Sequence, residues 1–348
     1  MQATVRKTSP YIRKETSTKR MMVDVLIALM PLVAYGIYQY RFEFFLKLIL
    51  ASVLAIAAEA FGFMLMKDKD QSIKDRFREK YTINNVIPPV ITAIIFLMTL
   101  PSSIPYVVVV VGILFAILIG KMIFGGLGKN VFNPAGLARI FVGLSFGSLF
   151  VYASVDGVTG ATALGQSFPE VLNSISFSEL FFGLIGGSSG EINKLAILLG
   201  GAYLLIRRAA DWRVVVTPLL TVAGLMLVAG IAQGFGTNLL FKYVLYHLLS
   251  GGLLFGIFFM ATDPITSPYT SRGRLIYGLI IGSLVVLIRL FGNLPEGMVF
   301  ALLVANIFVP VIDYKRWTKS YYTKNYIIGY AISVIVIALI VFAGMGGF

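Results

Sequence analysis

Apolar runs of roughly 20 residues recur along the chain and are separated by short polar segments. A run of this length crosses a hydrocarbon core of ~30 Å as a helix. Transmembrane strands would instead show about ten residues of alternating polarity, and the runs lack that alternation. We therefore predict membrane helices over residues 21–40, 44–66, 86–100, 105–124, 131–152, 193–207, 213–235, 239–262, 274–291, 296–313 and 325–345.

The two halves of the chain resemble each other. "ITAIIFLMTLPSSIP" (91–105) is similar to "LFGIFFMATDPITSP" (254–268), and residues 124–141 are similar to 291–308, at offsets of 163 and 167 residues. Both strings of the first pair end a helix at a proline, which indicates broken helices. Five predicted spans separate equivalent elements, so the second copy is inverted. Inverted repeats with broken helices are typical of transporters.

The pattern predicts an all-α membrane protein of 10–11 spans, with two inverted repeats of about five helices and one extra C-terminal helix. By itself this architecture does not distinguish the movement of a solute from the movement of electrons.

Positive charge orients the predicted helices. When successive spans alternate, 24 of the 29 Lys and Arg residues fall on the side of the N-terminus. Cytoplasmic loops carry such an excess, so we expect the N-terminus in the cytoplasm. The net charge of +13 then sets topology in the lipid bilayer and does not indicate nucleic acid. The expected segments are a cytoplasmic N-terminus (1–22), the first repeat (23–152), an extracytoplasmic loop (153–192), the second repeat (193–313) and a cytoplasmic loop with the extra helix (314–348).

Composition narrows the class further. Hydrophobic residues make up 58% of the chain and charged residues 13%, whereas soluble domains carry about 25% charged residues. We expect a multi-pass integral membrane protein of the helical class. The chain has no Cys, which excludes disulfides and Cys-ligated iron–sulfur clusters. A single His and few carboxylates argue against a protein-ligated haem or zinc.

The predicted extracytoplasmic loop contains Asp-Gly-Val-Thr-Gly-Ala-Thr-Ala-Leu at 156–164. Asp, Gly and Thr are ordinary turn residues, so a simple turn is the structural alternative. The string also matches the flavinylation signature Asp-x-x-[Ser/Thr]-Gly-Ala-Thr, whose last Thr is esterified to the phosphate of FMN. Here that residue is Thr162, preceded by Thr159 and Gly160. Small neighbours let the backbone approach a phosphate closely.

A second candidate lies in the glycine-rich segment 120–141 between two predicted spans. Backbone without helical partners at membrane depth must face protein or a polar cavity. The amides of Asn130 and Asn133 both donate and accept hydrogen bonds, which suits the edge of a planar heterocycle. The alternative is a tight reversal in which Lys121, Lys129 and Arg139 only anchor the topology.

Two carboxylates complete the candidates. Asp263 follows a broken helix, and Glu59 lies inside the second predicted span. Intramembrane acids are functional candidates by default. For Asp263 the alternative is a helix-ending Asp-Pro turn, and for Glu59 it is snorkelling or a salt bridge to Lys67. The polar turn 186–191 either closes over a flavin phosphate or starts the next helix, with Ser or Glu near its N-cap.

Three strings carry a resemblance to a known family: "GGLGKNVFNPAGLAR", "DGVTGATAL" and "MATDPITSP". Over roughly residues 20–320 the chain resembles the RnfD/NqrB family, the membrane flavoprotein subunits of ion-translocating respiratory complexes. The resemblance implies a phosphoester-linked FMN on Thr162, attached by a flavin transferase. It also implies that Asn130, Asn133 and Asp263 match positions around a second, non-covalent riboflavin in the NqrB branch. Glu59 matches an acid implicated in cation uptake, and the implied fold is two inverted five-helix repeats like those of urea transporters.

The short polar segment before the first span and the total length favour the RnfD branch, while the apolar run 325–345 departs from the family pattern. The resemblance then implies an Rnf-type ferredoxin:NAD⁺ oxidoreductase of the bacterial cytoplasmic membrane. Such a translocase couples electron transfer through covalent FMN to Na⁺ or H⁺ movement. Glu59 and Asp263 are the ion-coupling candidates. The ferredoxin and NAD sites would lie on the partner subunits RnfA, RnfB, RnfC, RnfE and RnfG, because this chain has neither cysteine clusters nor a Rossmann fingerprint. The alternatives are an NqrB-type subunit of a Na⁺-translocating NADH:quinone oxidoreductase and a urea-transporter-like channel or carrier without flavin.

Overall fold

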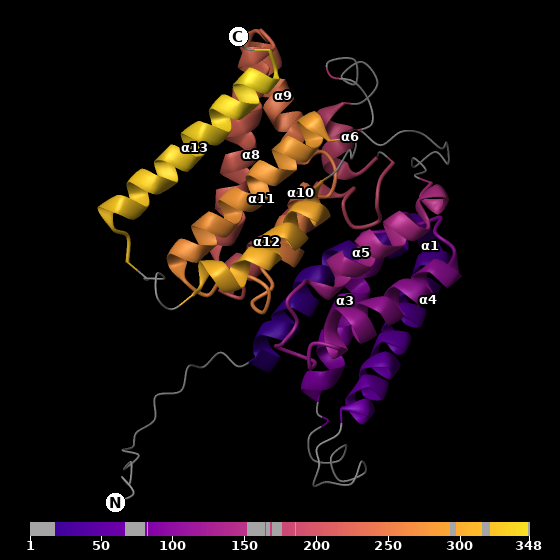
Figure 1. Ribbon diagram of the computed structural model, residues 1–348. Coiled ribbons are helices and arrows are strands. Elements are labelled where there is room, and N and C mark those ends of the chain that lie inside the picture. Colours follow the sequence, from indigo (N-terminus) through magenta and orange to yellow (C-terminus); the bar gives the residue numbers. More distant parts are fainter. Residues whose placement is uncertain are drawn as a thin grey trace, which may run out of the picture.

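The computed structural model describes residues 18–66, 81, 83–151, 164, 168, 176–184, 186–292, 297–314 and 321–346. Every regular element within these ranges is a helix, which confirms the all-α class. The helices form two neighbouring groups, one from the N-terminal part of the chain and one from the C-terminal part (Figure 1).

The N-terminal group begins with α1 (Thr18–Leu65), whose backbone breaks at Arg41 with φ 55° and ψ −138°. The element is therefore two helices, which correspond to the predicted spans 21–40 and 44–66. After it come α3 (Ile83–Met98), α4 (Tyr106–Leu114), the π-helix η1 (Phe115–Met122) and α5 (Pro134–Ser145). α1 packs mainly on α3.

The connection between the groups contains η2 (Gly147–Leu149) and the short α6 (Phe177–Phe182). The C-terminal group consists of α7 (Lys194–Ile206), α8 (Trp212–Ala232), α9 (Thr237–Leu249), α10 (Leu253–Phe255), the π-helix η5 (Gly256–Ala261), α11 (Ser271–Phe291), α12 (Met298–Ile312) and α13 (Lys324–Gly344). α13 packs on α8 and α11, and most of its surface is exposed.

Each predicted span contains a helix, but the helices differ in length. Within the described residues, α1, α8, α11 and α13 are long and apolar enough to cross a membrane. α9 and α10–η5 form a fifth candidate, bent by 56°. This break lies at residues 250–252, a position that the sequence interpretation did not predict. The predicted span 131–152 was too long, because α5 ends at Ser145.

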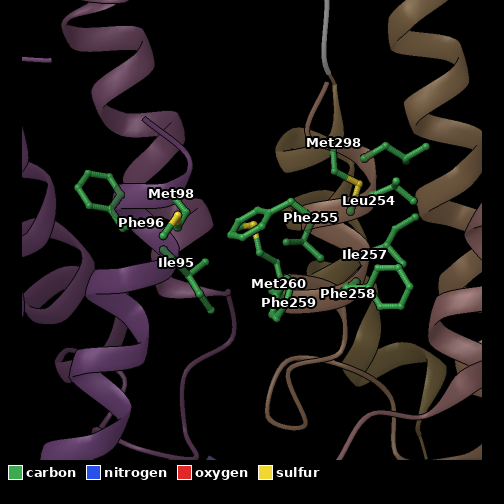
Figure 2. Close-up of a cluster of buried hydrophobic side chains, with 14 of the residues drawn as sticks. Ile95, Phe96, Met98, Leu254, Phe255, Ile257, Phe258, Phe259, Met260 and Met298 are labelled. Carbon is green, nitrogen blue, oxygen red and sulfur yellow. The ribbon is translucent and has the colours of Figure 1, made fainter. Parts of the chain in front are cut away.

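The two groups meet where α3 faces α10 and η5. Ile95 and Met98 lie on the side of α3 that faces Phe255 and Met260, whereas the Phe96 ring points to the other side of α3, toward Gly112 of α4 (Figure 2). All five side chains are buried, so the ends of α3 and η5 are held in one apolar core. This packing fixes the positions of the polar segments that follow each helix.

Candidate functional site

A pocket lies where polar segments of both groups converge. It brings together Asn130, Asn133 and Asp263, which come from segments more than a hundred positions apart in the sequence. Its other walls are largely apolar and come from α1, α3 and η5, and they include Met22, Val25, Ile91, Ile95, Leu127 and Phe259.

Two π-helices lead into this pocket. Lys121 lies near the end of η1, and Asp263 follows η5 after one intervening residue. A π-helix shifts the register of the side chains that follow it and is frequent at functional sites. Gly120 of η1 allows a close approach, since a Cβ there would lie 3.3 Å from Cα of Pro134. The sequence interpretation did not identify either π-helix.

Asn133 fixes the start of α5. Its Oδ1 accepts a hydrogen bond from the Gly136 backbone N–H at 3.1 Å, which makes it the N-cap. Its Nδ2 donates to the Met260 carbonyl at 3.3 Å, and its backbone N–H donates to Asn306 Oδ1 at 3.2 Å. The amide therefore ties α5 to η5 and α12 and has a structural role that the sequence interpretation did not include.

Asn130 and Asp263 line the pocket, and their side chains also form hydrogen bonds within the turns that contain them. Asn130 Nδ2 donates to the Phe132 carbonyl at 3.0 Å. The Asp263 carboxylate accepts from the Ile265 backbone N–H at 3.3 Å and from the Thr266 hydroxyl at 3.0 Å. The helix-ending turn and the pocket wall are thus two roles of the same aspartate.

Glu59 does not line the pocket and reaches it through Lys121. Lys121 Nζ donates to the two Glu59 oxygens at 2.7 and 2.6 Å, and the two side chains are 3% and 2% exposed. Lys121 also lines the pocket. The sequence interpretation assigned Lys121 only to topology and proposed Lys67 for Glu59. A buried carboxylate is stable only when it is paired with a cation or protonated, and its sequence neighbours do not reveal which cation packs beside it.

The sequence interpretation also missed a buried polar centre around Asn306. Asn306 Nδ2 donates to the Thr266 carbonyl at 3.0 Å and to the Tyr277 hydroxyl oxygen at 2.9 Å. Asn306 is buried and links α12, α11 and the segment after η5. The sequence signal that could have identified this centre is a single Asn within the apolar run of α12.

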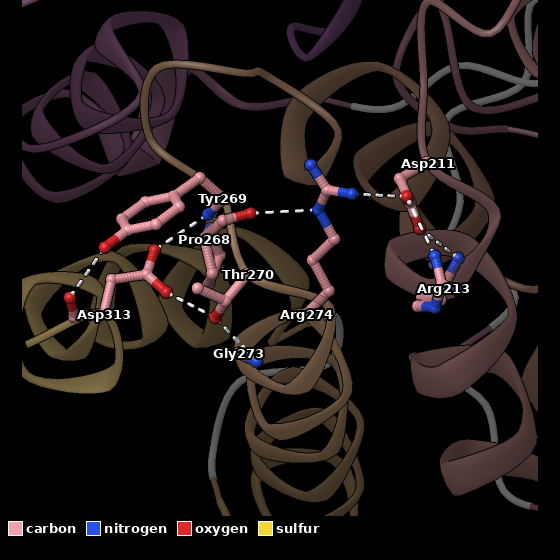
Figure 3. Close-up of polar contacts among 8 residues, drawn as sticks. All are labelled: Asp211, Arg213, Pro268, Tyr269, Thr270, Gly273, Arg274 and Asp313. Atoms are coloured by element: carbon pink, nitrogen blue, oxygen red, sulfur yellow. Dashed lines mark hydrogen bonds and ion pairs between the residues drawn. The ribbon is translucent and has the colours of Figure 1, made fainter. Parts of the chain in front are cut away.

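The far end of the segment after η5 is fixed by a second set of polar contacts (Figure 3). The Asp313 carboxylate accepts from the Tyr269 backbone N–H at 2.8 Å and from the Thr270 hydroxyl at 2.7 Å. Arg274 Nε donates to the Pro268 carbonyl at 3.0 Å, and its Nη1 pairs with Asp211, the N-cap of α8. Asp263 therefore lies in a segment that is held at both ends.

Thr162, Thr159 and Gly160 lie outside the described residues. Downstream of them, the Phe168 ring packs 4.9 Å from Tyr243 and 5.6 Å from Tyr246, measured between centroids. In α6, hydrogen bonds from the Ser176 backbone N–H and hydroxyl lower the pKa of Glu179 below its usual value.

The turn 186–191 packs against the end of α3. The backbone N–H groups of Ser189 and Gly190 donate to the carbonyls of Leu100 and Met98 at 3.0 and 2.8 Å. A Cβ at Gly190 would lie 2.5 Å from Met98 Cβ, so only glycine fits there. The N-cap of α7 is Asn193, which corrects the expectation of Ser or Glu. Among the described residues, no cluster of three His, Asp or Glu side chains is placed to hold a metal ion.

Comparisons with known proteins identify the family and relatives of this chain. A model of the NQR2, RnfD, RnfE family matches residues 5–322. The B subunit of the Na(+)-translocating NADH-quinone reductase of Ectopseudomonas mendocina (strain ymp) is 34% identical over 352 residues, with 89% of this chain and 87% of the relative covered. The D subunit of the ion-translocating oxidoreductase complex of Stutzerimonas stutzeri is 35% identical over 336 residues, with 86% and 90% covered. The B subunit of the reductase of Pseudoalteromonas atlantica (strain T6c / ATCC BAA-1087) is 39% identical over 234 residues, with 64% and 58% covered.

Proposed function

This chain belongs to the NQR2, RnfD, RnfE family. We propose that, within this family, it is the RnfD-type membrane flavoprotein of an Rnf-type ion-translocating oxidoreductase. Thr162 carries FMN through a phosphoester bond that a flavin transferase makes. The ferredoxin and NAD sites are on the other subunits, RnfA, RnfB, RnfC, RnfE and RnfG. The chain's own role is to carry electrons within the bilayer while the complex moves Na⁺ or H⁺.

The observation that carries the proposal is the convergence of Asn130, Asn133 and Asp263 on one pocket. Apolar walls suit the faces of a planar ring system, while the two amides and the Asp263 carboxylate suit its polar edge. These residues fit a second, non-covalent flavin. A bound flavin supplies the redox chemistry, and the protein supplies orientation and electrostatics.

We also propose that the two helix groups are inverted repeats. α3 and η5 occupy corresponding places, and each ends three positions before a proline. α5 and α12, the second helices after α3 and η5 when α4 and η1 are taken as one helix, pack on each other. α3 contacts α5 within the first group as η5 contacts α12 within the second. These pairings support the repeat inferred from residues 91–105 and 254–268.

Intact-mass spectrometry tests the covalent flavin. The chain is purified after co-expression with a flavin transferase, and the expected mass exceeds the bare polypeptide by one esterified FMN. Thr162→Val is expected to lose this mass entirely. Thr159→Ser is the matched control and keeps it, because the signature accepts Ser at that position. A wild-type mass equal to the bare translation product would contradict the flavoprotein and favour the solute channel or carrier.

The NqrB-type alternative receives equal support from the comparisons, since relatives of both kinds are 34–35% identical over similar lengths. The electron acceptor separates the two. The complex isolated with this chain is expected to reduce NAD⁺ with reduced ferredoxin. Reduction of a quinone by NADH instead would assign it to the NADH-quinone reductase.

A further inference from the structure

Lys121 pairs with one buried acid and lines the same pocket as another. Its ammonium binds both Glu59 oxygens within 2.7 Å, and its side chain also forms part of the pocket wall. Asp263 lines the same pocket. One cation therefore stands between a carboxylate of α1 and the space that the ligand would occupy.

The geometry makes the position of this cation sensitive to charge in the pocket. Charges a few ångströms apart interact strongly where water is excluded, and Lys121 and Glu59 are almost fully buried. Lysine carries a point charge on a flexible four-carbon stem, so its ammonium can turn between partners. A buried carboxylate that loses its cation must acquire another or be protonated.

We propose that Lys121 is a positioning residue that couples the charge of the pocket to cation uptake at Glu59. One negative charge added to the pocket draws the ammonium away from Glu59, and the carboxylate then takes up one H⁺ or Na⁺ from the aqueous phase. One negative and one positive charge enter together, so the net charge of the site is unchanged. The inference rests on the proposed function for the source of the negative charge, an electron that ferredoxin delivers through the complex.

The first test needs no flavin. Asn130→Asp places a negative charge on the pocket wall with almost no change of shape. We expect the melting temperature of the purified full chain to rise with Na⁺ concentration, or with falling pH, in this variant and not in the wild type. Titrating Na⁺ against choline at fixed pH, and pH at fixed Na⁺, identifies the cation. The added dependence should disappear in the double variant Asn130→Asp/Glu59→Gln.

Lys129→Glu is the matched control, because Lys129 is exposed on the same segment and should not create a Glu59-dependent effect. If the cation dependence of Asn130→Asp persists without Glu59, the cation binds at the introduced carboxylate and the proposal is wrong. The absence of any cation dependence in Asn130→Asp would also overturn it.

The second test uses the flavin-loaded chain and measures the reduction potential of the non-covalent flavin. Glu59→Gln frees the ammonium for the pocket and should raise the potential, whereas Lys121→Met removes it and should lower the potential. Both variants should lose the wild-type cation dependence, which for one cation per electron is about 59 mV per tenfold change. If the Lys121–Glu59 pair were purely structural, the two substitutions would lower the flavin content but leave the cation dependence of the reduction potential intact. Absence of non-covalent flavin from the wild type would refute the flavin pocket, while the first test would still decide the role of Lys121.

Discussion

Asn133 lies at the boundary between the pocket and the start of α5, and its amide contacts both groups of helices. The Oδ1 atom caps α5 through Gly136, and Nδ2 reaches the Met260 carbonyl. A substitution at this position therefore acts on the stability of the helix start and on the wall of the pocket. The two effects are separable because serine is also a good N-cap but lacks the amide.

We expect Asn133→Leu to lower the free energy of unfolding by about 1 kcal/mol more than Asn133→Ser, since leucine cannot cap a helix. Both variants should lower the amount of non-covalent flavin extracted from the purified chain, because both lack the amide. The measurements are denaturant unfolding in detergent and flavin fluorescence of the extract. Full flavin content in Asn133→Ser would show that the pocket does not use this amide.

At the scale of elements, α7 packs closely between its neighbours because two adjacent residues lack side chains. A Cβ at Gly200 would lie 2.1 Å from the Ala28 carbonyl oxygen of α1, and one at Gly201 would lie 2.3 Å from the Phe258 ring of η5. The sequence placed the helix at 193–207 from its apolar run. It did not indicate which face approaches α1, since small residues are common throughout the chain.

Gly200→Ala is expected to destabilise the chain by about 1–3 kcal/mol, because the added methyl group overpacks the contact with the α1 backbone. Gly224→Ala in α8 is the control, since no atom lies within 4 Å of its Cβ position. The control should be neutral or more stable by up to about 1 kcal/mol, as alanine favours a helix. Melting temperatures in detergent compare the pair, and equal effects would contradict the close contact.

At the scale of the molecule, the predicted orientation rests on the loop charges. The starts of α1 and α13 lie toward one end of the structure, whereas the end of α13 lies at the opposite end (Figure 1). This arrangement is compatible with a cytoplasmic N-terminus and an extracytoplasmic α6, and labelling can test it directly. The absence of Cys from the chain makes any introduced thiol unique.

We expect Ser178→Cys, on the exposed surface of α6, to react with a membrane-impermeant maleimide in intact spheroplasts. Lys129→Cys, exposed on the pocket side, should react only after the membrane is permeabilised. The extent of labelling is read from a mass shift on a denaturing gel. The reverse pattern would invert the proposed topology.

The sequence by itself determined the helical class, the approximate helix positions and the family, because the length of apolar runs, prolines and short motifs are local properties. It also identified Asn130, Asn133 and Asp263 as candidates. Only the tertiary structure decided that these residues share one pocket and that Glu59 pairs with Lys121, 62 positions away. Such pairings depend on how α1, η1 and η5 pack across the core, and packing between distant helices leaves no periodic signal in the sequence.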